Sequence, residues 1–91
     1  MSPARLALLL ALAAAPASAE EVPPGASACL GCHVPGRAGA IPSLRGRDAA
    51  EVAATMRAFR EGTRPATLMN RLASGFSEAE TRAIAAWIVA R

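Results

Sequence analysis

The sequence predicts an all-α fold: three to five short helices in one small domain. In two segments, apolar residues recur at helical spacing. Each of these segments begins with Ser or Asp followed three residues later by Glu, the pattern of an N-terminal capping box. No alternating run of β-branched residues, which would predict a strand, occurs in the 91 residues. We therefore expect helices joined by segments rich in Gly and Pro.

The first 19 residues have the pattern of a secretory signal peptide. Arg5 gives a positive start, residues 6–15 are apolar, and Ala17-Ser18-Ala19 supplies a small-x-small cleavage site. The apolar stretch is far shorter than the ~20 residues that a membrane-spanning helix needs. We expect residues 1–19 to be removed, residues 20–91 to form the mature domain without a membrane span, and the protein to be exported to the periplasm.

A short helix is expected to open at Pro24 or Ala26 and to lead into Cys29-Leu30-Gly31-Cys32-His33. The run C-x-x-C-H is the attachment signature of a c-type haem. One helical turn places both thiols along one edge of the macrocycle, where they form thioethers with its vinyl groups. The following imidazole then occupies an axial position on the iron. The motif predicts one covalent haem c held by Cys29, Cys32 and His33.

Other uses of these cysteines fit less well. A structural zinc site needs four ligands, and the chain offers two cysteines and one histidine. A thioredoxin-like pair would follow a strand in a βαβ unit, and no strand is predicted. A disulfide between Cys29 and Cys32 would leave the adjacent His33 unexplained. These readings remain the alternatives to haem attachment.

Residues 34–46, VPGRAGAIPSLRG, predict an irregular loop around the haem edge. A helix is expected after this loop and should end near Gly62, because the pair Asp48 and Glu51 forms a capping-box pattern. Its apolar stripe consists of Val52, Met56 and Phe59.

Two further helices are expected in the C-terminal third. Pro65 restarts the chain, and a short helix containing Leu68, Met69 and Leu72 should stop at Gly75. The pair Ser77 and Glu80 forms a second capping box. It opens a helix that should reach Arg91, with one face lined by Ile84, Trp87 and Ile88.

The second axial ligand must come from the other side of the haem. No second histidine exists, so the soft thioether of a methionine is the expected donor. Met56 lies on an apolar helix stripe, where methionine usually fills a core. Met69 follows the break at residues 64–67, whose irregular backbone can aim one side chain at the iron. We favour Met69 over Met56, and an iron without a methionine ligand is the remaining possibility.

The motif at residues 29–33, the run Ile41-Pro42-Ser43-Leu44, the downstream methionine and the C-terminal amphipathic helix together resemble a class I monohaem cytochrome c over residues 25–91. More narrowly, residues 59–77 are similar to the cytochrome subunit of flavocytochrome c sulfide dehydrogenase, which takes electrons from a sulfide-oxidising flavoprotein. The resemblance implies the class I fold, with short helices wrapped around one haem. It also implies that Pro42 offers its carbonyl to His33, that Leu44 packs on the haem face, and that Trp87 packs against the helix before the motif.

All ten cations are arginine, against seven acids. No acid occurs between His33 and Asp48, so the rim of the haem crevice is expected to be positive and to attract an acidic redox partner. Five arginines contribute to this rim: Arg37, Arg45, Arg47, Arg64 and Arg71. The absence of a basic block in an exported chain argues against nucleic acid as the partner.

The expected function is single-electron transfer. A haem with His and Met ligands is six-coordinate and leaves little room for substrate chemistry. The sequence has no set of Ser, His and Asp residues, no carboxylate pair and no phosphate loop, so we expect no catalysis by this chain alone. Three alternatives stay open: a freely diffusing carrier between respiratory or photosynthetic complexes, a haem ligand sensor or peroxidase, and an interaction module without haem.

Overall fold

The computed structural model describes residues 21–91, so the expected signal peptide at residues 1–19 lies outside the described residues. Within residues 21–91 the chain forms helices and no strands, which confirms the all-α prediction. No helix in this range is long and apolar enough to span a bilayer. The helices are α2 (Ala26–Cys29), α3 (Ala49–Glu61), α4 (Met69–Ala73) and α5 (Glu78–Ile88).

α2 is a single turn that begins directly after Gly25, whose φ of 83° lies in the left-handed region. Hydrogen-bonded turns continue the chain after α2. Gly31 N donates to Ala28 O at 3.1 Å, and His33 N donates to Cys29 O at 2.8 Å. The expected short helix is therefore present, and these turns deliver the whole C-x-x-C-H run in compact form.

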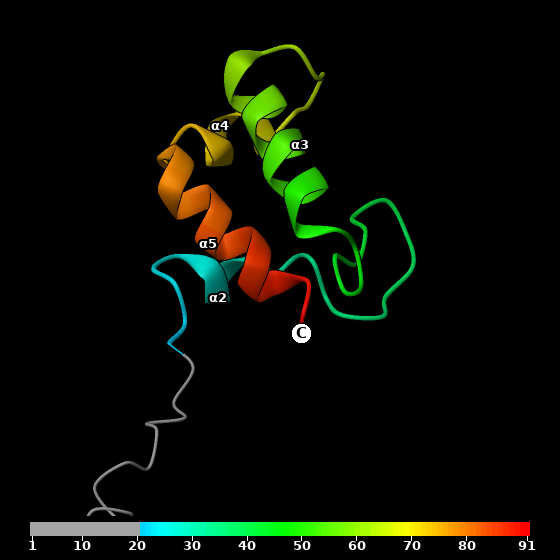
Figure 1. The fold of residues 1–91 in the computed structure, drawn as a ribbon. Coiled ribbons are helices and arrows are strands. Elements are labelled where there is room, and N and C mark those ends of the chain that lie inside the picture. Colours follow the sequence, from blue (N-terminus) through cyan, green and yellow to red (C-terminus); the bar gives the residue numbers. More distant parts are fainter. Residues whose placement is uncertain (1–20) are drawn as a thin grey trace, which may run out of the picture.

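Residues 34–47 contain no helix, as the Gly and Pro content predicts. Two contacts fix the loop. Gly36 N donates to Ser43 Oγ at 2.9 Å, which closes a ring within the loop. Gly46 N donates to Val89 O at 2.8 Å, which ties the end of the loop to the end of α5. Figure 1 shows this loop extending to one side of the helices.

α3 begins after Asp48, whose carboxylate accepts from Ala50 N, and ends at Gly62 with φ 76°. The predicted boundaries hold, but the predicted capping box does not form, because the Asp48 carboxylate accepts from Ala50 N and not from Glu51 N. Glu51 is exposed and, in the described part of the chain, does not accept from the backbone of Asp48.

α5 has the complete capping box. Glu80 N donates to Ser77 Oγ at 3.1 Å, and Ser77 N donates to Glu80 Oε1 at 2.9 Å. The helix ends at Ile88, three residues before the predicted end at Arg91. Together, the two bonds satisfy two N–H groups that would otherwise lack partners.

α3 and α5 lie side by side. α4 packs beside α3, and α2 packs beside the C-terminal part of α5 (Figure 1). The buried cluster consists of Ala26, Ile84, Trp87 and Ile88. Trp87 on α5 thus packs against the helix before the haem motif, as the resemblance implies. Every member of this cluster comes from α2 or α5, and Val52 of α3 packs against it while only partly buried.

Candidate functional site

α2 and the turns after it bring the two cysteines and His33 to one end of a pocket. Both thiols are free, and Cys32 is exposed. Cys29 is half-buried, with its Sγ directed to Gly25 O at 3.8 Å. Burial raises the pKa of the Cys29 thiol, so this sulfur is protonated at neutral pH. Two free thiols of this spacing are available to form thioethers.

The loop orients the imidazole of His33. Its Nδ1 lies 2.7 Å from Pro42 O. A carbonyl oxygen only accepts, so the proton of the neutral ring is on Nδ1 and the lone pair is on Nε2. This is the arrangement in which metal-binding histidines are held, with one nitrogen donating to a backbone carbonyl and the other free to bind the metal.

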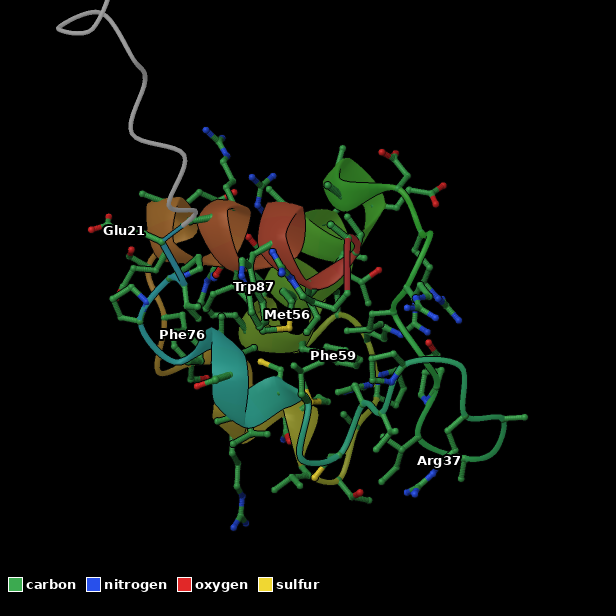
Figure 2. All side chains as sticks on the ribbon, turned by 90° about the horizontal axis from the view of Figure 1, so that it is seen from below. Glu21, Arg37, Met56, Phe59, Phe76 and Trp87 are labelled. Atoms are coloured by element: carbon green, nitrogen blue, oxygen red, sulfur yellow. The ribbon has the colours of Figure 1, made fainter. Side chains whose placement is uncertain are left out.

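A pocket lies between the four helices and the loop, with a cavity volume of about 40 Å³. Apart from His33 and Thr81, the side chains that line it are apolar or contain sulfur. They are Cys29, His33, Leu44, Val52, Met56, Met69, Thr81, Ile84, Ala85 and Ile88. Figure 2 shows Met56 in the interior of the helical assembly. Imidazole, thiol and thioether groups in an apolar pocket form the donor set that a c-type haem requires.

The predicted site residues occupy different parts of this pocket. The wall of the pocket includes Cys29, His33, Leu44 and Met69. Pro42 does not line the pocket, but its carbonyl oxygen accepts a hydrogen bond from His33. Cys32 is exposed and does not line the pocket either. The structure also brings Met56 into the same wall, so both candidate methionines face one space.

The sequence analysis missed Thr81 as a pocket residue. Thr81 precedes Ile84 by three positions and Ile88 by seven, so it continues the apolar stripe of α5. Only 2% of its surface is exposed. A hydroxyl on an otherwise apolar stripe is the signal that could have indicated a polar contact inside the pocket.

α3 shows that the pocket needs a large apolar occupant. The helix has thirteen residues, yet no side chain on it is fully buried in the described structure. Val52 and Met56 face the pocket and are only half-buried. A flat macrocycle in the pocket would cover this face of α3. The apolar face of α3 and the donor set therefore both fit a haem.

Alternative metal chemistry has little support in the described residues. Nowhere in residues 21–91 do three or more His, Cys, Asp or Glu side chains form a group that could hold a metal ion. The pair of cysteines and His33 is therefore short of the four ligands that a structural zinc site uses.

The family described as "Cytochrome C oxidase, cbb3-type, subunit III" matches residues 25–88. The chain is also similar to a protein of Thiomonas intermedia (strain K12) named "Thiosulfate dehydrogenase electron acceptor". The two are 37% identical over 73 residues, which cover 74% of this chain and 34% of the relative. The chain thus spans about a third of that relative's length.

The matched residues contain the C-x-x-C-H motif, the loop, all four helices and every residue of the pocket wall. The match also agrees with the all-α fold of the described residues and with the donor set of the pocket. The chain therefore belongs to this family of cytochrome c domains, carries covalently bound c-type haem, and is an electron-transfer protein rather than an enzyme.

Proposed function

We propose that this chain is a periplasmic cytochrome, with residues 1–19 removed, whose haem accepts single electrons from an enzyme that oxidises a reduced inorganic sulfur compound. Cys29 and Cys32 form the thioethers, and His33 and Met69 bind the iron. The observation that carries the proposal is the pocket itself, in which an oriented imidazole and a thioether share an apolar space beside two free thiols. Such a haem passes electrons and binds no substrate.

The structure supports particular roles for two loop residues. Pro42 accepts from the Nδ1–H of His33 and so raises the basicity of Nε2, the nitrogen that binds iron. Leu44 lines the pocket and would pack on the haem face near His33. Neither residue touches a reacting substrate, so both act by positioning the haem.

The choice of Met69 over Met56 rests on backbone freedom. Met69 is the first residue of α4 and follows Leu68, whose φ of −130° and ψ of −44° are not helical. Met56 lies in the middle of α3, where the thirteen-residue helix fixes its direction. The terminal position lets the chain adjust Met69 to the iron at little cost in helical hydrogen bonds.

Two findings point to a sulfur-oxidising partner. The relative's name describes an electron acceptor of thiosulfate dehydrogenase. Residues 59–77 resemble the cytochrome subunit that serves a sulfide-oxidising flavoprotein. Both partners would oxidise an inorganic sulfur compound and need a one-electron acceptor.

The arginines after the motif provide a docking surface for an acidic partner. Arg37 and Arg71 are exposed and have no ion-pair partner in the described part of the chain. Figure 2 shows Arg37 far out on the loop. Arg45 and Arg47 instead donate to the carbonyls of Arg91 and Ser43, and Arg64 lies over the Phe59 ring. The free guanidinium groups would steer a negatively charged partner toward the pocket mouth.

Anaerobic stopped-flow mixing tests the proposal. The ferric holoprotein is mixed with a purified thiosulfate-oxidising enzyme and its substrate, and separately with a sulfide-oxidising flavoprotein and sulfide. We expect ferrous absorption bands to appear in one mixture at a rate that saturates with enzyme and falls as salt is added. Reduction by neither enzyme, together with rapid reduction by an unrelated respiratory complex, would instead establish the freely diffusing carrier.

A pair of charge reversals gives the control. Arg37→Glu should slow reduction by the partner without changing the reduction potential, because Arg37 itself is exposed and does not line the haem pocket. Arg82→Glu is the control for net charge, since Arg82 is exposed on α5, does not line the haem pocket and has only a 3.9 Å ion-pair contact with Glu78. Equal slowing by both variants would show a general charge effect instead of a docking surface.

A further inference from the structure

Thr81 has a hydroxyl proton without an acceptor. The residue lies in the first turn of α5, is almost completely buried, and lines the haem pocket. Its Oγ1 accepts a hydrogen bond from Arg60 Nη1 at 3.4 Å. In the described residues, no group accepts the proton that Oγ1 itself carries. A buried hydroxyl donor is costly to leave unsatisfied, so the position calls for an acceptor in the pocket.

Arg60 determines where this proton points. Its side chain is only 24% exposed and is held by two further contacts. Nη2 donates to Glu78 Oε2 at 2.6 Å, and Nη1 also lies 3.4 Å from Phe76 O. A guanidinium has no acceptor, so the Thr81 proton must point away from Arg60. The donation from Arg60 also polarises the hydroxyl and makes it a stronger donor.

The pocket wall offers few acceptors. Of the two nitrogens of His33, Nδ1 donates to Pro42 O and Nε2 is the proposed iron ligand. The other lining side chains with lone pairs for the Thr81 proton are those of Cys29, Met56 and Met69. The Cys29 sulfur is the expected thioether. A methionine sulfur that binds iron through one lone pair keeps a second one, which can accept a weak hydrogen bond.

We propose that Thr81 is a positioning residue that donates a hydrogen bond to the sulfur of the iron-bound methionine, and that Arg60 holds the hydroxyl in this orientation. The inference rests on the proposed His and Met ligation and goes beyond it. The hydrogen bond withdraws electron density from the sulfur, which weakens its donation to ferric iron more than to ferrous iron. Thr81 thereby raises the reduction potential.

The test compares three holoproteins. Thr81→Val keeps the shape of the side chain and removes the donor, Thr81→Ser restores the donor, and Thr55→Val is the control on α3, outside the pocket wall. For each protein, the reduction potential and the methionine-to-iron absorption band of the ferric form are measured.

We expect Thr81→Val to lower the ferrous-to-ferric ratio at fixed electrode potential at least threefold, or about 28 mV at roughly 59 mV per tenfold change. Its methionine band should shift, because the sulfur donates more strongly. Thr81→Ser should return both values toward those of the unchanged protein, and Thr55→Val should alter neither.

The outcomes separate the inference from the function on which it rests. A wild-type protein without a methionine band would overturn both. A wild-type band that Thr81→Val leaves unchanged, with an unchanged potential, would overturn the role of Thr81 alone and leave His and Met ligation standing. A change in Thr81→Val that Thr81→Ser does not reverse would indicate an effect of packing and would also overturn it.

Discussion

The ring of Phe76 occupies the space that a side chain on residue 25 would need. A Cβ placed on Gly25 would lie 2.7 Å from Phe76 Cε1, and Gly25 also has a φ of 83°. Phe76 is half-buried between α4 and α5 and packs against the buried cluster. The absence of a side chain at residue 25 thus allows an aromatic ring to close the end of the core (Figure 2).

Replacing Gly25 with Ala should therefore destabilise the holoprotein by about 2 to 4 kcal/mol, from the strained backbone and the clash with Phe76 together. The measurement is the free energy of unfolding in guanidinium. Gly36→Ala is the matched control, because Gly36 has a φ of 77° but no atom within 4 Å of a built Cβ. It should cost only about 1 to 2 kcal/mol. Equal losses would show that the Phe76 contact has no effect.

The two methionines should respond differently to truncation. Met69→Ala is expected to abolish the methionine-to-iron absorption band and to open the iron to cyanide or carbon monoxide. Met56→Ala should keep the band and lower stability by about 1 to 2 kcal/mol, at the low end for a methionine because the side chain is only half-buried. Spectra of both ferric variants decide the matter, and loss of the band in Met56→Ala alone would reverse the assignment.

The chain without haem should be largely unfolded. Its fully buried apolar side chains number six in the described residues, and three of them are alanine. A core of this size gives a small domain little stability. The double variant with Cys29→Ala and Cys32→Ala, expressed without attached haem, should show weak helical circular dichroism. A native-like helical spectrum would show that the helices pack without the macrocycle.

The capping box of α5 should make stability depend on acid. Hydrogen bonds from the backbone and side chain of Ser77 lower the pKa of Glu80 below its usual range. A carboxyl whose folded pKa lies below its unfolded value of about 4.3 stabilises the fold above that pH. This contribution is lost as the pH falls through the lower folded value.

Glu80→Gln tests this contribution, because glutamine can still accept from Ser77 N but carries no charge. The denaturation midpoints of the variant and the unchanged protein should differ at pH 7 and converge once the pH has fallen below the lowered pKa of Glu80. Subtracting the two curves removes the pH dependence that both proteins share. A constant difference across the pH range would count against the charged capping contact.

The sequence predicted local structure better than side-chain neighbours. Ser77 and Glu80 form the expected capping box because both partners lie within one turn. Gly62 ends α3 because its positive φ suits glycine. The capping box predicted for Asp48 and Glu51 was wrong, because the Asp48 carboxylate accepts from Ala50 N instead. Residues within one helical turn have few other partners within reach. The residue types alone therefore predict most hydrogen bonds within a turn.

The pocket wall was harder to anticipate. Helical spacing assigned Met56 to core filling, but the structure places it in the same wall as Met69. Thr81 was passed over because its neighbours on the stripe are apolar. Which residues share a pocket depends on how α3 and α5 are rotated relative to each other, and periodicity within one helix does not determine that rotation.

The incomplete burial of α3 should make the protein without haem sensitive to proteolysis. A polypeptide that fails to acquire its prosthetic group would leave the apolar side of a thirteen-residue helix open to water and to proteases. Faulty copies would then be degraded while loaded copies persist. The weakness of the unaided interior would thus act as quality control during maturation.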